Sequence, residues 1–268
     1  MSKKISNLTI SYLLFLLLLS FSATSPEPWK TVLQILGYVA PIILALLTSR
    51  ERIGDLRYLS LTKQGLIDAI PLIAPTLSVI MTVSYLTSLL VILISGKGGG
   101  VDLGDNYFVA IIIHALVPAV FEEILFRYLP MRLLSSYSRR VTVLVSALFF
   151  ALVHHDFFSI PYAFIAGIVF MTVDLASDSI LPSVLIHFIN NALSVSLVMF
   201  KDNPLVAPAI LWALGIMTVV SFIFIIVKRH RYKQILLFAF SGGEKLTFNF
   251  EMLVFSVITL FMAVLQLL

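Results

Sequence analysis

Three ionisable side chains interrupt an apolar segment of the chain: Glu122, Glu123 and Arg127. From Tyr107 the sequence reads YFVAIIIHALVPAVFEEILFRY, and no charged residue precedes Glu122 in it. Burying a charge in apolar surroundings is costly unless the charge is paired. Ionisable groups inside membrane segments therefore usually face a partner or a cavity, and they indicate a functional site.

The spacing of these three residues predicts different tasks for the two glutamates. Glu123 and Arg127 are four residues apart with the glutamate N-terminal, the better orientation for a helical ion pair. We expect this pair to keep Glu123 ionised and structural. Adjacent helix positions point about 100° apart, so Glu122 faces elsewhere and is available as a general base. The alternative is that all three form a charge cluster at the inner membrane face.

Two further polar pairs occur at helical spacing in other apolar segments. His187 and Asn191 are four residues apart, so the imidazole and the amide lie one above the other on one helix face. Two such donors can bind an oxygen that becomes negative during acyl transfer. Hydrogen bonding between helices explains this pair equally well. In FFALVHHD, the i,i+4 spacing places His154 on the same face as Phe150.

The remaining polar residues near these segments are interpreted as structural. We expect Asn190 to pack between helices. Asp174 and Asp178 have the positions of solvated residues at a helix end, and His155 and Asp156 those of a solvated turn.

The elements that must position these residues are membrane-spanning helices. The chain has 268 residues, of which 60% are hydrophobic and 12% charged, with a mean hydropathy of +1.05. A soluble domain is about half apolar and about a quarter charged. This predicts an all-α, polytopic membrane protein that forms a single integral membrane domain over residues 1–268.

Cysteine content and charge exclude several classes of function. The chain contains no cysteine, which excludes a thiol nucleophile, Cys-ligated zinc and disulfides. The net charge is +4, but the basic residues lie at the ends of apolar runs. That distribution indicates contact with the lipid bilayer and not with nucleic acid.

A helix needs about 20 apolar residues to cross about 30 Å of hydrocarbon. Nine apolar runs approach this length, at 8–24, 31–49, 69–95, 107–127, 141–155, 161–176, 180–200, 208–227 and 249–268. With a cytoplasmic N-terminus, every Lys and Arg except Lys30, Lys97 and Lys201 falls on the inner side. This agrees with the positive-inside rule. We therefore expect a multi-pass protein with its N-terminus in the cytoplasm, in the cell membrane if the source is prokaryotic.

Three motifs occur in order on separate apolar segments: E-E-x-x-x-R at 122–127, F-x-x-x-H at 150–154 and H-x-x-x-N at 187–191. Their order and polytopic setting resemble the CPBP family of intramembrane proteins, which includes CAAX proteases and bacteriocin-processing proteins. Within it, the chain is similar to CAAX prenyl endopeptidases of the Rce1 type. The resemblance covers a catalytic helix core at 107–195.

The resemblance implies about eight to nine transmembrane helices around a cavity open to the cytosolic side. It also implies hydrolysis of a peptide bond, with removal of the C-terminal tripeptide from prenylated CAAX substrates. Glu122 and His154 would activate water, and His187 and Asn191 would form the oxyanion site. Glu123 and Arg127, the other two residues of the first motif, would support this arrangement. The implied chemistry needs no metal and no other cofactor.

Other functions stay open beside this one. Glu122, His154 and His187 are the ligand types of a two-His, one-carboxylate zinc site. We favour metal-independent chemistry because the chain has no H-E-x-x-H motif. A bacteriocin-immunity or scaffold protein and a transporter are the non-enzymatic alternatives. The expected partner is a prenylated or otherwise membrane-anchored peptide, and the sequence carries no prediction of an oligomeric state.

Overall fold

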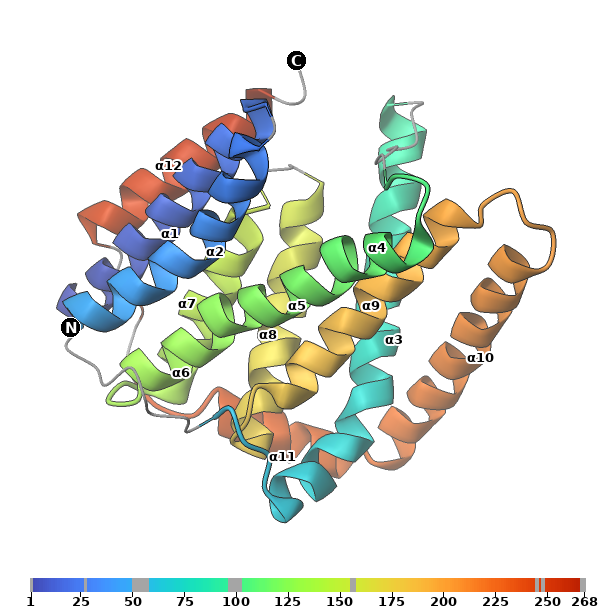
Figure 1. Ribbon diagram of the computed structural model, residues 1–268. Coiled ribbons are helices and arrows are strands. Elements are labelled where there is room, and N and C mark those ends of the chain that lie inside the picture. The colour runs from blue at the N-terminus through green and yellow to red at the C-terminus, as the bar shows by residue number, and fades with distance from the viewer. Residues whose placement is uncertain are drawn as a thin grey trace. The chain divides into compact units, whose positions relative to one another are not determined.

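The computed structural model describes residues 2–26, 28–49, 58–95, 103–154, 158–243, 246 and 249–265. All regular structure in these ranges is helical, and they contain no strand (Figure 1). The all-α prediction is therefore confirmed. The turn predicted at His155 and Asp156 lies outside the described residues.

Helices follow one another along the whole described chain. They are α1 (Ser2–Thr24), α2 (Trp29–Thr48), α3 (Lys63–Ser95), α4 (Tyr107–Ile111), η1 (Ile112–Leu116), α5 (Val117–Glu123), η2 (Ile124–Tyr128), α6 (Leu129–Leu133), α7 (Arg139–Leu152), α8 (Ser159–Ser177), α9 (Leu181–Met199), α10 (Val206–Val227), α11 (Arg229–Ala239) and α12 (Phe250–Leu265). The elements from α4 to α6 are consecutive parts of one continuous rod at Tyr107–Leu133.

Seven helices in the described residues are long and apolar enough to cross a membrane, and Phe250–Val264 is a shorter apolar helix. The chain is therefore a polytopic integral membrane protein, as predicted. All nine predicted spans coincide with helices. The run predicted at 141–155 is α7, which has 14 residues. At 1.5 Å per residue α7 is about 21 Å long, short of the hydrocarbon thickness.

The chain divides into two compact units. The first unit contains Met1–Tyr58, Ile124–Ile168 and Phe240–Leu268. In it, α1 packs against both α2 and α12 (Figure 1). A Cβ atom on Gly167 of α8 would lie 2.7 Å from Ala147 Cα of α7. Only glycine lets these two backbones approach so closely.

The second unit contains Leu59–Glu123 and Val169–Ala239. In it, α9 packs against η1 and α5, and α3 packs against both α9 and α10. Pro75 has no N–H, so the Pro71 carbonyl four residues earlier loses its helical donor. The Tyr232 hydroxyl of α11 donates to that carbonyl at 2.8 Å. This bond ties α11 to α3 at the point where the helix ladder is interrupted.

Candidate active site

The rod at Tyr107–Leu133 changes from α- to π-helix twice, at η1 and at η2. The middle residues of the two π turns, His114 and Phe126, each precede a proline by four positions. A proline ring clashes with the carbonyl four residues earlier and cannot donate to it, so the α-helical pattern fails there. The short α-helix between the π turns carries Glu122 and Glu123 at its end. Single π turns of this kind occur often at functional sites.

In the first unit, side chains supply the donors that the second of these prolines removes. Pro130 cannot donate to the Phe126 carbonyl, and the Ser146 hydroxyl of α7 does so. Arg127 Nη1 donates to the same carbonyl at 3.3 Å. The Tyr12 hydroxyl of α1 donates to the Leu125 carbonyl at 2.9 Å. The π turn is therefore held by its own Arg127 and by two side chains from other helices, Ser146 and Tyr12.

His154 lies just after the end of α7, in the same unit. Its ring contacts the Phe150 ring edge-on, with 4.9 Å between the ring centroids, as the four-residue spacing predicts. The guanidinium of Arg127 lies over the same Phe150 ring, 4.3 Å from its centre. His154 Nδ1 is 2.7 Å from the Phe150 carbonyl oxygen. A carbonyl only accepts, so Nδ1 carries the proton and Nε2 is the acceptor of the neutral ring.

In the second unit, His187 lies between the two glutamates. His187 Nδ1 is 2.8 Å from Glu123 Oε1, in a buried hydrogen bond. Glu122 Oε2 lies 4.0 Å from His187 Nε2. The side chain of Glu123 is fully buried, whereas that of Glu122 is 17% exposed. The two glutamates thus approach opposite nitrogens of one ring, and only Glu122 is within reach of solvent.

Phe170 and Asn190 fix the orientation of the polar pair on α9, His187 and Asn191. The ring of Phe170 stacks on that of His187, with 5.4 Å between centroids and 28° between planes. Asn190 Nδ2 donates to Asn191 Oδ1 at 3.2 Å, so the amide nitrogen of Asn191 remains a donor for another group. Asn190 is buried, in keeping with its predicted packing role, but it also orients Asn191.

Asp174 has a role that the sequence reading missed. The interpretation of Asp174 as a solvated residue is wrong, because its side chain is fully buried. Asp174 Oδ2 accepts from the Ser183 hydroxyl at 2.7 Å, and Oδ1 accepts from the Ser183 backbone N–H at 3.3 Å. A carboxylate at these donors satisfies the first turn of α9 and complements its dipole. Ser183 lies one turn before His187, so Asp174 helps to fix the helix that carries His187. Asp178 is exposed, as predicted.

The six predicted site residues fall into two groups. Glu122, Glu123, His187 and Asn191 belong to the second unit, and the first three are brought together there. Arg127 and His154 belong to the first unit. Pairing of Glu123 with Arg127, and the sharing of a water molecule by Glu122 and His154, join residues of different units and stay predictions.

The geometry around His187 bears on metal binding. The described part of the chain has no group of three His, Asp or Glu side chains placed to hold a metal ion. The physical reason is that Glu122 and Glu123 approach opposite ring nitrogens of His187. Ligands of one ion must converge on one point, and these three do not.

A family model described as type II CAAX prenyl endopeptidase Rce1-like matches residues 104–193. The matched range is a third of the chain and includes all six predicted site residues. No curated protein and no solved structure matches the chain. The resemblance that the three motifs indicate is thus confirmed over this range. Residues 104–193 are therefore similar to the Rce1-like type II CAAX prenyl endopeptidases.

Proposed function

We propose that the protein is an intramembrane endopeptidase that removes the C-terminal tripeptide from a prenylated, membrane-anchored peptide. The observation that carries this proposal is the buried imidazole of His187, held between two carboxylates within the Rce1-like domain. A scaffold does not require this arrangement, because each buried polar group adds a desolvation cost. The proposed hydrolysis uses all three side chains: Glu122 as the base, His187 as the oxyanion donor and Glu123 as the partner that orients His187.

In the proposed mechanism, Glu122 and His154 take a proton from a water molecule, whose oxygen attacks the scissile carbonyl carbon. Glu122 is the exposed member of the glutamate pair, and His154 presents Nε2 as an acceptor. The C–N bond then breaks, and the proton passes to the leaving amine. General acid–base catalysis of this kind contributes roughly 10²- to 10⁴-fold in rate.

His187 and Asn191 would donate to the oxyanion of the tetrahedral intermediate. Because Nδ1–H is held by Glu123, His187 donates from Nε2 when the ring is doubly protonated. Glu123, at 2.8 Å, supplies the paired charge that a buried imidazolium needs. Removing one well-placed oxyanion donor costs roughly 3–4 kcal/mol of transition-state stabilisation.

The test uses the full chain purified in detergent and incubated with two fluorogenic peptides of one sequence, one farnesylated and one not. We expect cleavage of the farnesylated peptide only, because the anchor concentrates the peptide at the membrane. Cleavage of neither peptide, by protein that is folded, would contradict the proposal. Cleavage of both peptides at equal rates would support peptidase activity but contradict a preference for prenylated substrates.

The zinc alternative is tested in the same assay. We expect full activity after dialysis against a strong chelator, since the chain has no H-E-x-x-H motif. Loss of activity that added Zn²⁺ restores would contradict metal-independent hydrolysis.

We also propose that the N-terminus is cytoplasmic and that the reacting cavity opens on that side, where the C-terminus of an anchored protein lies. The distribution of Lys and Arg supports this orientation.

A further inference from the structure

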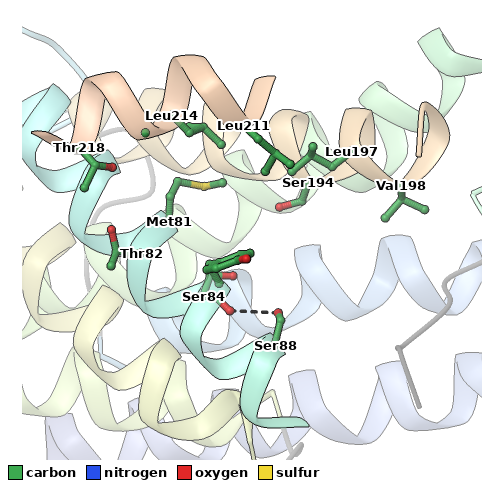
Figure 2. Close-up of a pocket in the computed structure, with 12 residues that line it drawn as sticks. Met81, Thr82, Ser84, Ser88, Ser194, Leu197, Val198, Leu211, Leu214 and Thr218 are labelled. Carbon is green, nitrogen blue, oxygen red and sulfur yellow. Dashed lines mark hydrogen bonds between the residues drawn. The ribbon is translucent and has the colours of Figure 1, made fainter. Parts of the chain in front are cut away.

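A cavity of about 550 Å³ lies between α3, α9 and α10, and the proposed reaction does not use it. Figure 2 shows the side chains that line it. Leu211 and Leu214 come from α10, Met81 from α3, and Leu197 and Val198 from α9. The wall is mainly apolar, although Thr82, Ser84, Tyr85, Ser88, Ser194 and Thr218 add hydroxyl groups to it.

Three of these six hydroxyl groups are satisfied within their own helices. Thr82, Ser88 and Ser194 each donate to the carbonyl four residues earlier in the same helix, at 2.7, 3.0 and 3.0 Å (Figure 2 marks the bond of Ser88). A hydroxyl group that is satisfied by its own helix does not require a polar ligand. The cavity suits hydrocarbon.

The volume indicates the size of that hydrocarbon. A water molecule occupies about 30 Å³, and a methylene group is of about the same size. The cavity thus holds on the order of 18 such groups, which is the length of a long isoprenoid or acyl chain. Its volume is typical of pockets that bind small molecules, which are about 300–1,000 Å³.

The cavity continues the reacting face of α9. Ser194 and Val198 follow His187 by seven and eleven residues, and at about 100° per residue both return to within about 40° of its direction. Asn191 lies on the same face. Along the helix axis, Ser194 is about 10 Å and Val198 about 16 Å beyond His187. A chain that starts at His187 and follows this face of α9 would reach the cavity after about 10 Å.

We infer that this cavity binds the hydrocarbon chain of the lipid-anchored peptide while its scissile bond lies beside His187 and Asn191. The inference rests on the proposed function for the identity of the substrate. It follows that the cavity between α3, α9 and α10 determines which lengths of hydrocarbon chain the protein accepts. Three observations carry it: the apolar side chains that three helices contribute, the three hydroxyl groups that bond within their own helices, and the common face of α9.

Gly215 offers a direct test, because it lines the cavity and a Cβ atom there would meet nothing within 4 Å. Gly215→Leu places four carbon atoms, about 120 Å³, in this space. We expect KM for a peptide with a 20-carbon chain to rise roughly tenfold or more, as for methylene groups excluded from an apolar pocket. KM for a 10-carbon chain and kcat for both should stay unchanged.

The matched control is Ile216→Phe, which adds bulk at the next residue of α10. Ile216 is 62% exposed and does not line the cavity. Its KM values should equal those of the parent. If Gly215→Leu leaves both KM values unchanged, or raises both by the same factor, the cavity does not bind the chain.

Photo-cross-linking gives a readout that does not depend on cleavage. A peptide with a diazirine on its 20-carbon chain should label cavity residues of α3, α9 and α10, and Gly215→Leu should reduce the label about tenfold. A phospholipid with a diazirine on its acyl chain forms the second arm. If only the phospholipid labels the cavity, and excess lipidated peptide does not displace it, the site belongs to bilayer lipid and the inference is wrong. Labelling by the peptide without any cleavage supports the cavity site and contradicts the proposed function.

Discussion

At His187 the two glutamates differ in what each can do. Glu123 is fully buried and hydrogen-bonded to Nδ1, which suits a residue that orients the ring. Glu122 is partly exposed and 4.0 Å from Nε2, which suits a residue that meets water. A carboxylate with access to solvent can exchange protons with the reactants, whereas a fully enclosed one acts through its neighbour.

Replacing Glu122 should abolish cleavage without unfolding the protein. Glu122→Gln keeps the shape of the side chain but removes the base, so we expect kcat to fall roughly 10²- to 10⁴-fold. The measurement is steady-state cleavage of the farnesylated peptide, with gel filtration to verify folding. The control is Glu251→Gln, at a glutamate of α12 that accepts from Ser6, which should keep parental activity. Equal activity of both variants would exclude Glu122 as the base.

Alanine and glutamine at position 123 should have different effects on stability. Glu123→Ala leaves the buried Nδ1–H of His187 without its acceptor, and we expect a loss of about 1–3 kcal/mol in the free energy of unfolding. Glu123→Gln retains an acceptor oxygen and should recover most of this stability while kcat stays reduced. Thermal unfolding in detergent and cleavage rates measure the two effects. Equal stability of the Ala and Gln variants would contradict the orienting role.

The spacing of residues within one segment predicted part of the candidate site. The contact of His154 with Phe150 follows from helical periodicity within one segment. The bond from Glu123 to His187 joins segments 64 residues apart, and one sequence contains no information on which membrane helices face each other. The occurrence of ionisable residues in apolar segments indicated that these residues need partners. Which residues are the partners became clear only from the fold.

At the level of helices, apolar run length predicted where nine helices lie, because each must reach across the hydrocarbon. The π turns were not predicted, since the face assignments assumed an α-helix throughout Tyr107–Leu133. Pro118 and Pro130 each follow the centre of a π turn by four residues, but Pro41, Pro71 and Pro75 lie inside α-helices without one, so proline alone does not predict a π turn. Across η2 the hydrogen-bond step is five residues, so the i,i+4 argument for Glu123 and Arg127 does not hold without change.

The start of α9 should depend on Asp174. Asp174→Ala removes the acceptor of the Ser183 N–H and leaves the Ser183 hydroxyl only its bond to the Ile180 carbonyl, and we expect the free energy of unfolding to fall by about 1–3 kcal/mol. Cleavage should also weaken, because Ser183 lies one turn before His187. Thermal unfolding and kcat provide the measurements. Asp178→Asn is the control, since Asp178 is exposed and asparagine tolerates its φ of 52°. Similar losses in both variants would contradict the cap.

Two glycines in membrane helices should respond to alanine with opposite signs. Alanine favours a helix interior by about 1 kcal/mol over glycine. Gly215→Ala meets open space and should gain up to this amount, whereas the Cβ of Gly167→Ala would lie 2.7 Å from Ala147 Cα and should separate α7 from α8. We expect a higher unfolding temperature for the first variant and a lower one for the second. A gain at both positions would contradict the close packing at Gly167.

For the whole molecule, the orientation in the membrane follows from the predicted spans and the basic residues. Lys201 lies between α9 and α10, and Arg229 lies just beyond α10. The 22 residues of α10 extend about 33 Å, enough to cross the hydrocarbon. A membrane-spanning α10 puts the two positions on opposite sides, and the positive-inside rule predicts that Arg229 is the cytoplasmic one.

The absence of cysteine makes this orientation directly measurable, because the unmodified chain gives no thiol background. We expect Lys201→Cys to react with a membrane-impermeant maleimide in intact cells, and Arg229→Cys to react only after permeabilisation. Both side chains are exposed, so a lack of reaction reports the membrane and not burial. The reverse pattern would place Glu122, five residues before Arg127, near the outer face. The proposed site would then open away from cytoplasmic substrates, and prenylated peptides made in the cytoplasm would not reach it.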